Sequence, residues 1–155
     1  IRAIEIDTYL VGYKQCAVSD GCLHPKTILD AKFSTPYSVS AAFLYGTVGM
    51  EQFESEVVFD PAVQNLLEKV TVHPADRFTE QYPKHWGCHV KVTMQDGTVY
   101  EVEVKDPSGS VARPLSREQA MKKAEEFLSV VCPGRVTETI EELLNLESRN
   151  MLPSI

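Results

Sequence analysis

Polar and apolar side chains alternate near the start of the chain, and this pattern predicts a first β-strand. Positions 4 to 10 are mostly apolar at the even numbers and mostly polar at the odd ones. A period of two residues is typical of a half-buried strand, so we expect a strand over residues 4–10. From Gly12 to Asp30 no period holds, and Gly21 and Pro25 punctuate the segment, which predicts a long irregular loop. Loops of that length are usually functional or disordered.

Two proline-containing caps predict helices. Ser34-Thr35-Pro36 places a hydroxyl N-cap just ahead of a proline in the first helical turn, and the helix should end at Gly46. Asp60-Pro61 repeats this signal before apolar residues at helical spacing. We also expect a short helical piece over residues 50–55, and a strand over residues 70–73 directly after the second helix.

Asp96-Gly97 lies between two alternating segments and predicts a β-hairpin. A two-residue loop would place Glu101 opposite Val92 and bring a charge onto the apolar side of the sheet. A three-residue loop, with Gly97 left-handed at a bulge, pairs Val92 with Tyr100 instead. We therefore expect the three-residue loop.

Helical patterns dominate the C-terminal part. Ser116 and Gln119 form a capping box, and an apolar stripe with charges opposite it continues to Val131. Apolar residues at 140, 143 and 144 predict another short helix, whereas the tail 150–155 has little pattern. Strands and helices that mix without regular β-α-β alternation predict an α+β fold. We expect a two-layer sandwich, with a largely antiparallel sheet, helices on one face, and C-terminal helices after it.

Length and charge narrow the class of protein. A chain of 155 residues suits one domain, which we expect to span residues 1–155, with the sheet and first helices in about 1–115 and the C-terminal helices in 116–149. The net charge of −7, without clusters of Lys and Arg, argues against binding to nucleic acid or to an anionic membrane surface. No apolar stretch approaches the roughly 20 residues of a membrane span.

The cysteines favour a reducing compartment. Cys16, Cys22, Cys88 and Cys132 are too few and too dispersed for a secreted disulfide scaffold, so we expect a cytoplasmic protein. Cys16, Cys22 and His24 lie close together in sequence, which raises the question of a zinc site. None of them has the paired spacing of structural zinc ligands. We therefore expect small buried thiols and no metal.

Polar residues gather where the expected loop meets the helix that follows Ser34. Lys32 adds a positive charge, Tyr37 adds a phenol, and the helix start offers unpaired N–H groups, which together suit a carboxylate ligand. Asp30 belongs to the same cluster. The alternative is that Ser34 only caps the helix and Tyr37 packs in the core. The residues alone leave both interpretations open.

The segment Asp30–Ala42, DAKFSTPYSVSAA, followed by Gly46-Thr47-Val48, resembles a motif of the MmgE/PrpD family. That family includes 2-methylcitrate dehydratase, cis-aconitate decarboxylase and iminodisuccinate epimerase. The resemblance covers nearly the whole chain. Further matches follow in chain order at Phe53, Asp60-Pro61-Ala62-Val63, Val70-Thr71-Val72, Tyr82-Pro83, Val92–Gly97 and Arg113-Pro114-Leu115-Ser116.

The resemblance implies that this chain is the smaller lid of a longer enzyme, whose large helical domain carries most of the catalytic residues and is absent here. It implies lyase chemistry on a di- or tricarboxylate without metal or cofactor, in a full-length protein that forms a homo-oligomer. Tyr37 matches the tyrosine that the lid lends to the substrate pocket. We therefore expect its hydroxyl to point into the cleft and to act in catalysis. Lys32, Ser34 and His24 are expected near the substrate only by their proximity.

Two alternatives remain open. The full-length protein could catalyse another reaction of the family, such as epimerisation, because the lid does not determine which proton moves. The chain could also be a non-catalytic binding or assembly module that kept the fold. A chain that begins at Ile1, within a strand pattern, predicts an excised piece. We expect that piece to be inactive alone, because the base that abstracts the proton would come from the absent domain.

Overall fold

The computed structural model describes residues 1–148 of the chain. The chain divides into two compact units, Ile1–Pro107 and Ser108–Ile155. The first unit consists of β1 (Ala3–Thr8), α1 (Leu10–Cys16), α2 (Asp20–Leu23), α3 (Ile28–Lys32), α4 (Thr35–Tyr45), η1 (Glu51–Phe53), α5 (Ser55–Val58), α6 (Pro61–Leu67), β2 (Val70–Pro74), α7 (Asp76–Thr79), β3 (Cys88–Thr93) and β4 (Val99–Val104). The second unit contains α8 (Arg117–Val131), α9 (Val136–Leu144) and η2 (Leu146–Ser148).

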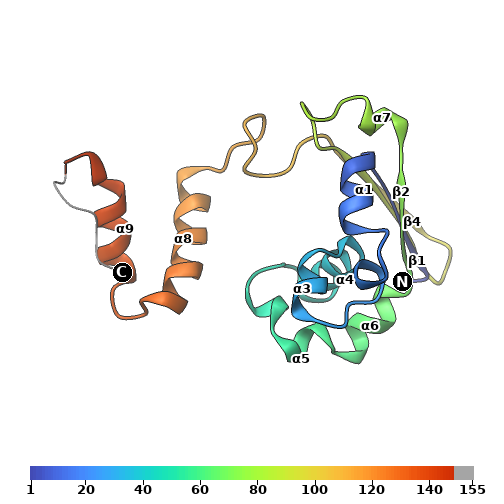
Figure 1. Cartoon of the computed structure of the whole chain (residues 1–155), viewed down its shortest axis with the longest axis horizontal. Coiled ribbons are helices and arrows are strands. Elements are labelled where there is room, and N and C mark those ends of the chain that lie inside the picture. The colour runs from blue at the N-terminus through green and yellow to red at the C-terminus, as the bar shows by residue number, and fades with distance from the viewer. Residues whose placement is uncertain (149–155) are drawn as a thin grey trace. The chain divides into compact units, whose positions relative to one another are not determined.

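The strands form one mixed sheet in the order β2-β1-β3-β4. β1 pairs in parallel with β2 and antiparallel with β3, which in turn pairs antiparallel with β4. Figure 1 shows α1, α3, α4 and α6 gathered beside these strands. The predicted α+β fold with a largely antiparallel sheet is therefore confirmed.

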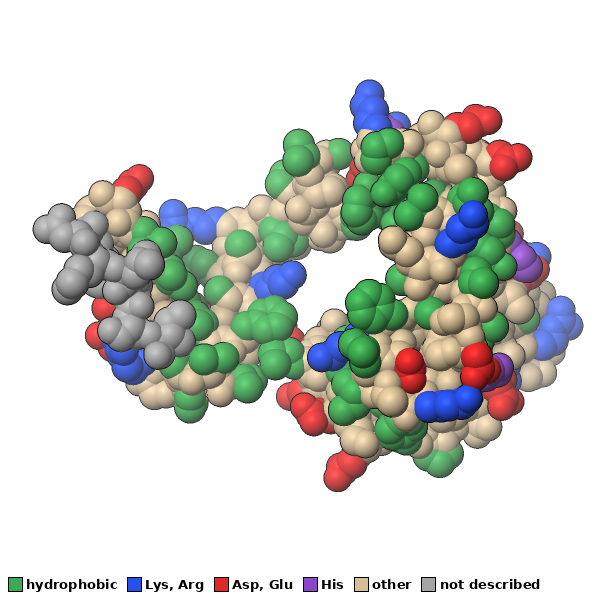
Figure 2. Space-filling view, viewed as in Figure 1, with side chains coloured by type: hydrophobic (Ala, Val, Ile, Leu, Met, Phe, Trp, Pro, Cys, Tyr) green, Lys and Arg blue, Asp and Glu red, His purple; other side chains and the backbone are tan. Residues whose placement is uncertain are grey.

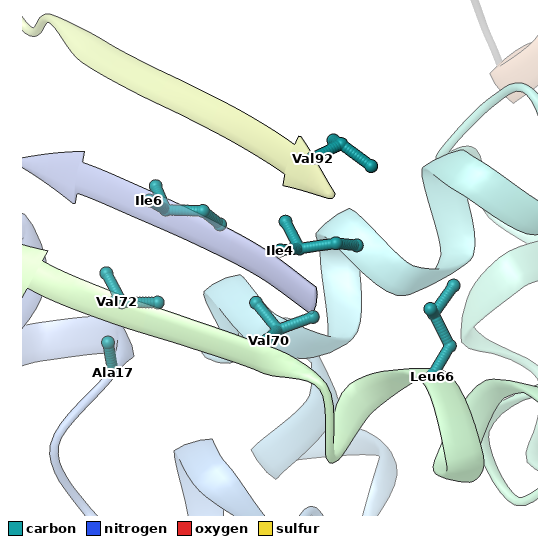
Figure 3. Packing of buried hydrophobic residues seen from close by; sticks show 7 residues of the cluster. All are labelled: Ile4, Ile6, Ala17, Leu66, Val70, Val72 and Val92. Atoms are coloured by element: carbon teal, nitrogen blue, oxygen red, sulfur yellow. The ribbon is translucent and has the colours of Figure 1, made fainter. Parts of the chain in front are cut away.

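The main core lies between the sheet and the helices. Ile4 and Ile6 of β1 are buried there, and Ile4 lies between its partners Val70 of β2 and Val92 of β3. Odd-numbered residues point to the opposite face, where Glu5 pairs with Lys91 at 2.9 Å between carboxylate and ammonium. Such alternation is typical of a sheet that is covered on one face only. Figure 3 shows the buried cluster: Ile4, Ile6, Ala17, Leu66, Val70, Val72 and Val92.

The segment after β1 differs from the sequence prediction. β1 ends at Thr8, and the chain then forms α1, α2 and α3 where an irregular loop was expected. α1 has no side-chain cap, contains Gly12 and buries no residue fully, so its sequence carries neither a start signal nor a clear period. α3 does carry a signal, since Thr27 and Asp30 form a capping box.

The capped helices are confirmed. Ser34 caps α4, and its Oγ accepts a hydrogen bond from the Tyr37 N–H at 3.0 Å. Gly46 ends the helix in the left-handed conformation, with φ of 73°. The carboxylate of Asp60 caps α6 in the same way. Residues 50–55 form η1 and the first residue of α5 in place of one helical piece.

The hairpin between β3 and β4 has the predicted register. Val92 lies opposite Tyr100, and the Met94 N–H donates to the Thr98 carbonyl at 2.8 Å to close a three-residue loop. Gly97 has φ of 88°, in the region that L-residues disfavour. The pairing confirms that the apolar face sets the loop length.

Gly97→Ala is expected to lower the free energy of unfolding by about 1 kcal/mol, the usual cost of a side chain in a left-handed position. An added Cβ at Gly97 would meet no atom within 4 Å, so conformational strain is the only cost. Urea unfolding of both proteins measures the difference. Gly134→Ala is the control, because its Cβ also enters open space and its φ is not left-handed. Equal losses in the two variants would contradict the strain argument.

In the second unit the capping box is confirmed. The Ser116 N–H donates to Gln119 Oε1 at 2.9 Å, and the Gln119 N–H donates to Ser116 Oγ at 3.1 Å. α9 covers the short helix that was predicted around Ile140, which is buried together with Thr139. The prediction for the tail 150–155 lies outside the described residues.

Candidate functional site

Ser34 and Tyr37, two of the predicted site residues, lie inside the first unit. Ser34 is 2% exposed and Tyr37 is fully buried. Ser34 Oγ accepts from the Tyr37 N–H at 3.0 Å and donates to the carbonyl oxygen of Cys22. One hydroxyl therefore caps α4 and also ties it to α2. In this structure Ser34 serves as the helix cap and Tyr37 lies in the core, and the contact of either residue with a substrate stays a prediction.

The Tyr37 side chain points to the segment of residues 49–53, which we call the cover segment. Its hydroxyl donates to the carbonyl oxygen of Gln52, and its ring packs on Phe53 with 5.6 Å between ring centroids. Gln52 is itself buried and accepts from the Gly49 N–H at 2.8 Å through Oε1. We expected the hydroxyl to face an open cleft. In this chain it is enclosed instead, because the cover segment supplies its acceptor.

Burial sets the proton affinity of this phenol. It raises the pKa of Tyr37 to about 12, with a smaller contribution from Tyr45. A phenol with that pKa keeps its proton at neutral pH. Tyr37 can therefore donate a hydrogen bond or a proton, but it does not act as a base there.

Lys32 and His24 lie on the surface of the same region. Lys32 is the last residue of α3, and His24 is the C-cap of α2; both are exposed. Lys32 lies two residues before Ser34, and His24 lies two residues after Cys22. The hydrogen bond from Ser34 to the Cys22 carbonyl therefore joins the segments that carry these two surface residues. The structure thus brings the segments that carry Lys32 and His24 together around a buried link.

Asp30, also part of the predicted polar cluster, serves the start of α3. Its carboxylate accepts from the Thr27 hydroxyl and N–H, each at 2.9 Å, and from the Lys26 N–H at 3.1 Å. The hydrogen bond from the Thr27 side chain, followed by that from the Lys26 backbone, lowers the pKa of Asp30. This carboxylate is therefore committed to the turn before the helix.

The surface beside Lys32 is unusually apolar. Leu29 is 65% exposed and Phe33 is 57% exposed, and the two are one helical turn apart. Figure 2 shows hydrophobic side chains mixed with charged ones over the visible face of the first unit. An exposed apolar patch rimmed by charge is typical of a surface that binds another part of a protein.

The described residues also bear on metal and membrane binding. Within residues 1–148, no three side chains of His, Cys, Asp or Glu are grouped so as to hold a metal ion. The four cysteines are free thiols. In the same part of the chain, no helix has both the length and the apolar character needed to cross a bilayer.

The structure defines the class of protein as an α+β domain. Its helix α4 is capped by the buried Ser34, and Lys32 and His24 lie on the surface nearby in the chain. A family profile described as MmgE/PrpD C-terminal domain matches residues 1–147. The chain belongs to the MmgE/PrpD family and corresponds to its C-terminal domain.

Three curated relatives are similar to this chain. Cis-aconitate decarboxylase of Mus musculus is 30% identical over 136 residues, which is 83% of this chain and 27% of that protein. The mitochondrial 2-methylcitrate dehydratase of Yarrowia lipolytica is 27% identical over 75% of this chain and 23% of its own length. A cis-aconitate decarboxylase-like protein of Aspergillus oryzae is 28% identical over 80% of this chain and 26% of its own length. The chain thus spans about a quarter of the length of these relatives.

Proposed function

We propose that this chain is the C-terminal lid domain of a lyase that acts on di- or tricarboxylates. The reaction would be dehydration of 2-methylcitrate or citrate, or decarboxylation of cis-aconitate. The family match over residues 1–147, together with relatives named for these reactions, is the observation that carries the proposal. The catalytic base would come from a helical domain outside this chain, and the lid would close the cleft above it.

The surface residues suit such a substrate. Loss of water or CO₂ from a polycarboxylate builds negative charge next to the carboxylates that remain. The ammonium of Lys32 and the imidazole of His24 would stabilise this charge from the surface that the Ser34–Cys22 bond holds together. In this scheme neither a metal nor a cofactor is needed.

Tyr37 is the residue that we propose for direct contact with the substrate. A phenol that keeps its proton can donate to a substrate carboxylate or to the leaving group. The cover segment lies over the hydroxyl in this chain, so contact requires that segment to move when the lid closes. Residues 49–53 contain one three-residue helical turn, η1, and no residue of β1 to β4. Their movement would break the Tyr37–Gln52 hydrogen bond and the Tyr37–Phe53 ring contact and would expose the buried Gln52.

Three further properties of the full-length protein are part of the proposal. The free thiols of the four cysteines support a reducing compartment such as the cytoplasm. The apolar side chains of Leu29 and Phe33 support a partner surface beside the site, which the helical domain would cover. We also propose that the full-length protein forms a homo-oligomer.

An assay of the full-length protein tests the proposed reaction. We expect the full-length protein to convert one of 2-methylcitrate, citrate and cis-aconitate. Turnover is measured as loss of the substrate and appearance of the unsaturated or decarboxylated product. The 155-residue chain alone is the control and should convert none of them. Turnover by the isolated chain would contradict the lid assignment. A full-length protein that epimerises a dicarboxylate, or that converts nothing, would favour one of the two alternatives.

Leu29→Asp tests the lid surface. The side chain is 65% exposed, so the isolated chain should keep its melting temperature. In the full-length enzyme the aspartate would be buried without a partner against the helical domain, and we expect turnover to fall about tenfold. Val111→Asp, at a fully exposed position in the second unit, is the matched control. Unchanged turnover in Leu29→Asp would show that this surface stays uncovered.

A further inference from the structure

Within residues 1–148, β4 is an edge strand of the sheet, because it pairs with β3 on one side only. Met94 and Thr98 form a hydrogen-bonded pair at the hairpin end, with 2.8 Å from the Met94 nitrogen to the Thr98 oxygen. Antiparallel ladders alternate bonded and non-bonded pairs, so the backbone groups of Val99, Glu101 and Glu103 point away from β3. In the described part of the chain, no backbone hydrogen bond from a loop or turn uses these groups.

An apolar groove of about 390 Å³ lies beside this edge, on the helix side of the sheet. Its lining includes Tyr100 and Val102 of β4, Val90 and Met94 of the β3 side, and Phe43 of α4. Tyr100 is 62% exposed and Val102 is 55% exposed. α1 and α4 pack on β2 at the other edge of the sheet, so they leave β4 uncovered. A strand added next to β4 would extend the apolar face over this groove.

The opposite face of the same strands carries an excess of negative charge. Glu101 and Glu103 point to this face, and Glu5 of β1 lies on it as well. Asp7 of β1 lies there too, 3.7 Å from Arg77. Lys91 bonds Glu5 at 2.9 Å and Arg77 bonds Glu103 at 2.8 Å, so four carboxylates face the two cations Lys91 and Arg77. A strand added at the edge would therefore meet apolar side chains on one of its faces and carboxylates on the other.

A second copy of this chain does not suit the edge. In the two antiparallel two-fold registers that pair the most residues of two β4 strands, Glu101 lies opposite the Glu101 or the Glu103 of the other copy. Like charges directly opposite each other destabilise a sheet. A strand that fits beside β4 therefore has apolar residues on its groove side. On its other side it has Lys or Arg at the positions where a second β4 would have Glu.

We propose that the β4 edge binds, by strand addition, an extended segment of a partner protein in which apolar residues alternate with Lys or Arg. The apolar residues fill the groove beside Tyr100 and Val102, and the cations lie next to Glu101 and Glu103. The outward backbone groups of β4 receive the ladder bonds. This binding site goes beyond the proposed lyase function and does not depend on it.

The test titrates the whole 155-residue chain with a synthetic peptide of seven residues, alternating Lys and Val, acetylated and amidated at its ends. We expect binding that weakens as salt is added, with NMR shifts on β3 and β4. A peptide with Glu in place of Lys should not bind. Equal binding of the acidic peptide, no binding of the basic one, or shifts confined to the helices would overturn the proposal.

Two variants locate the binding at the edge. Glu101→Pro removes an outward N–H without removing a bond to β3, and edge strands tolerate proline, so we expect a folded protein that no longer binds the peptide. Glu101→Gln with Glu103→Gln keeps every backbone group and should weaken binding about tenfold. Glu118→Gln, an exposed glutamate of α8, is the charge control and should bind normally. Unchanged affinity in both edge variants, or a dimer of the wild type that Glu101→Pro abolishes, would contradict the proposal.

Discussion

Tyr37→Phe in the full-length protein is expected to lower turnover by about a hundredfold or more, where a hundredfold is the lower end of the range for a group that donates a proton in the transition state. The phenol has a pKa of about 12 and is therefore a donor at neutral pH. The same substitution should lower the free energy of unfolding by about 1–3 kcal/mol, because the buried carbonyl of Gln52 loses its donor. The bond to Gln52 therefore predicts a loss of stability beside the loss of turnover.

Measuring both quantities separates the two roles of the hydroxyl. Turnover is compared well below the melting temperature of each protein, and unfolding is followed by urea titration. Tyr13→Phe, which removes a hydroxyl from a partly buried tyrosine beside the main core, is the control and should keep normal turnover. If Tyr37→Phe loses stability but turns over at the wild-type rate, the hydroxyl is structural and the proposed contact with the substrate is wrong.

Ser34→Ala is expected to destabilise the first unit by about 2–4 kcal/mol. The variant loses the N-cap of α4, which is usually worth about 0.5–2 kcal/mol. It also leaves the buried carbonyl of Cys22 without its donor, at a further cost of about 1–3 kcal/mol. Urea unfolding monitored by the fluorescence of Trp86 measures the sum.

Ser40→Ala is the matched control, because it makes the same change at a fully buried position of the same helix. Ser40 Oγ donates to the Pro36 carbonyl at 2.9 Å, a bond within the helix that adds little to its stability. We expect a much smaller loss than in Ser34→Ala. If both variants lost the same free energy of unfolding, the hydrogen bond from Ser34 to the Cys22 carbonyl would add nothing to stability beyond the loss of a buried hydroxyl.

The sequence predicts the parts of the fold in which local chemistry and burial agree. Ser34 and Asp60 mark the starts of α4 and α6 because their side chains bond to the helix N–H groups. The hairpin register follows from keeping Val92 and Tyr100 on one face. α1 was missed because none of its residues is fully buried and because it begins after Tyr9, whose side chain makes no cap bond. α3 could have been found from the spacing of Thr27 and Asp30.

The candidate site is less predictable. Its residues stand out in the sequence, but their partners do not. The Tyr37 hydroxyl donates to the backbone carbonyl of Gln52, and the Ser34 hydroxyl donates to the backbone carbonyl of Cys22. Any residue type supplies a carbonyl, so no motif marks these two positions. The segments around them, 49–53 and 20–23, also lack a period that would place them against α4.

The parallel pairing of β1 with β2 has a consequence for synthesis of the chain. β1 leaves the ribosome before the other strands of the sheet, and its neighbours β2 and β3 are made only after all the helices from α1 to α6. At a synthesis rate of about 5–20 residues per second, β1 lacks both neighbouring strands for several seconds, and the core side chains of Ile4 and Ile6 are not yet covered by them. Glu5 and Asp7 interrupt this apolar segment and act as gatekeepers against aggregation of the nascent chain.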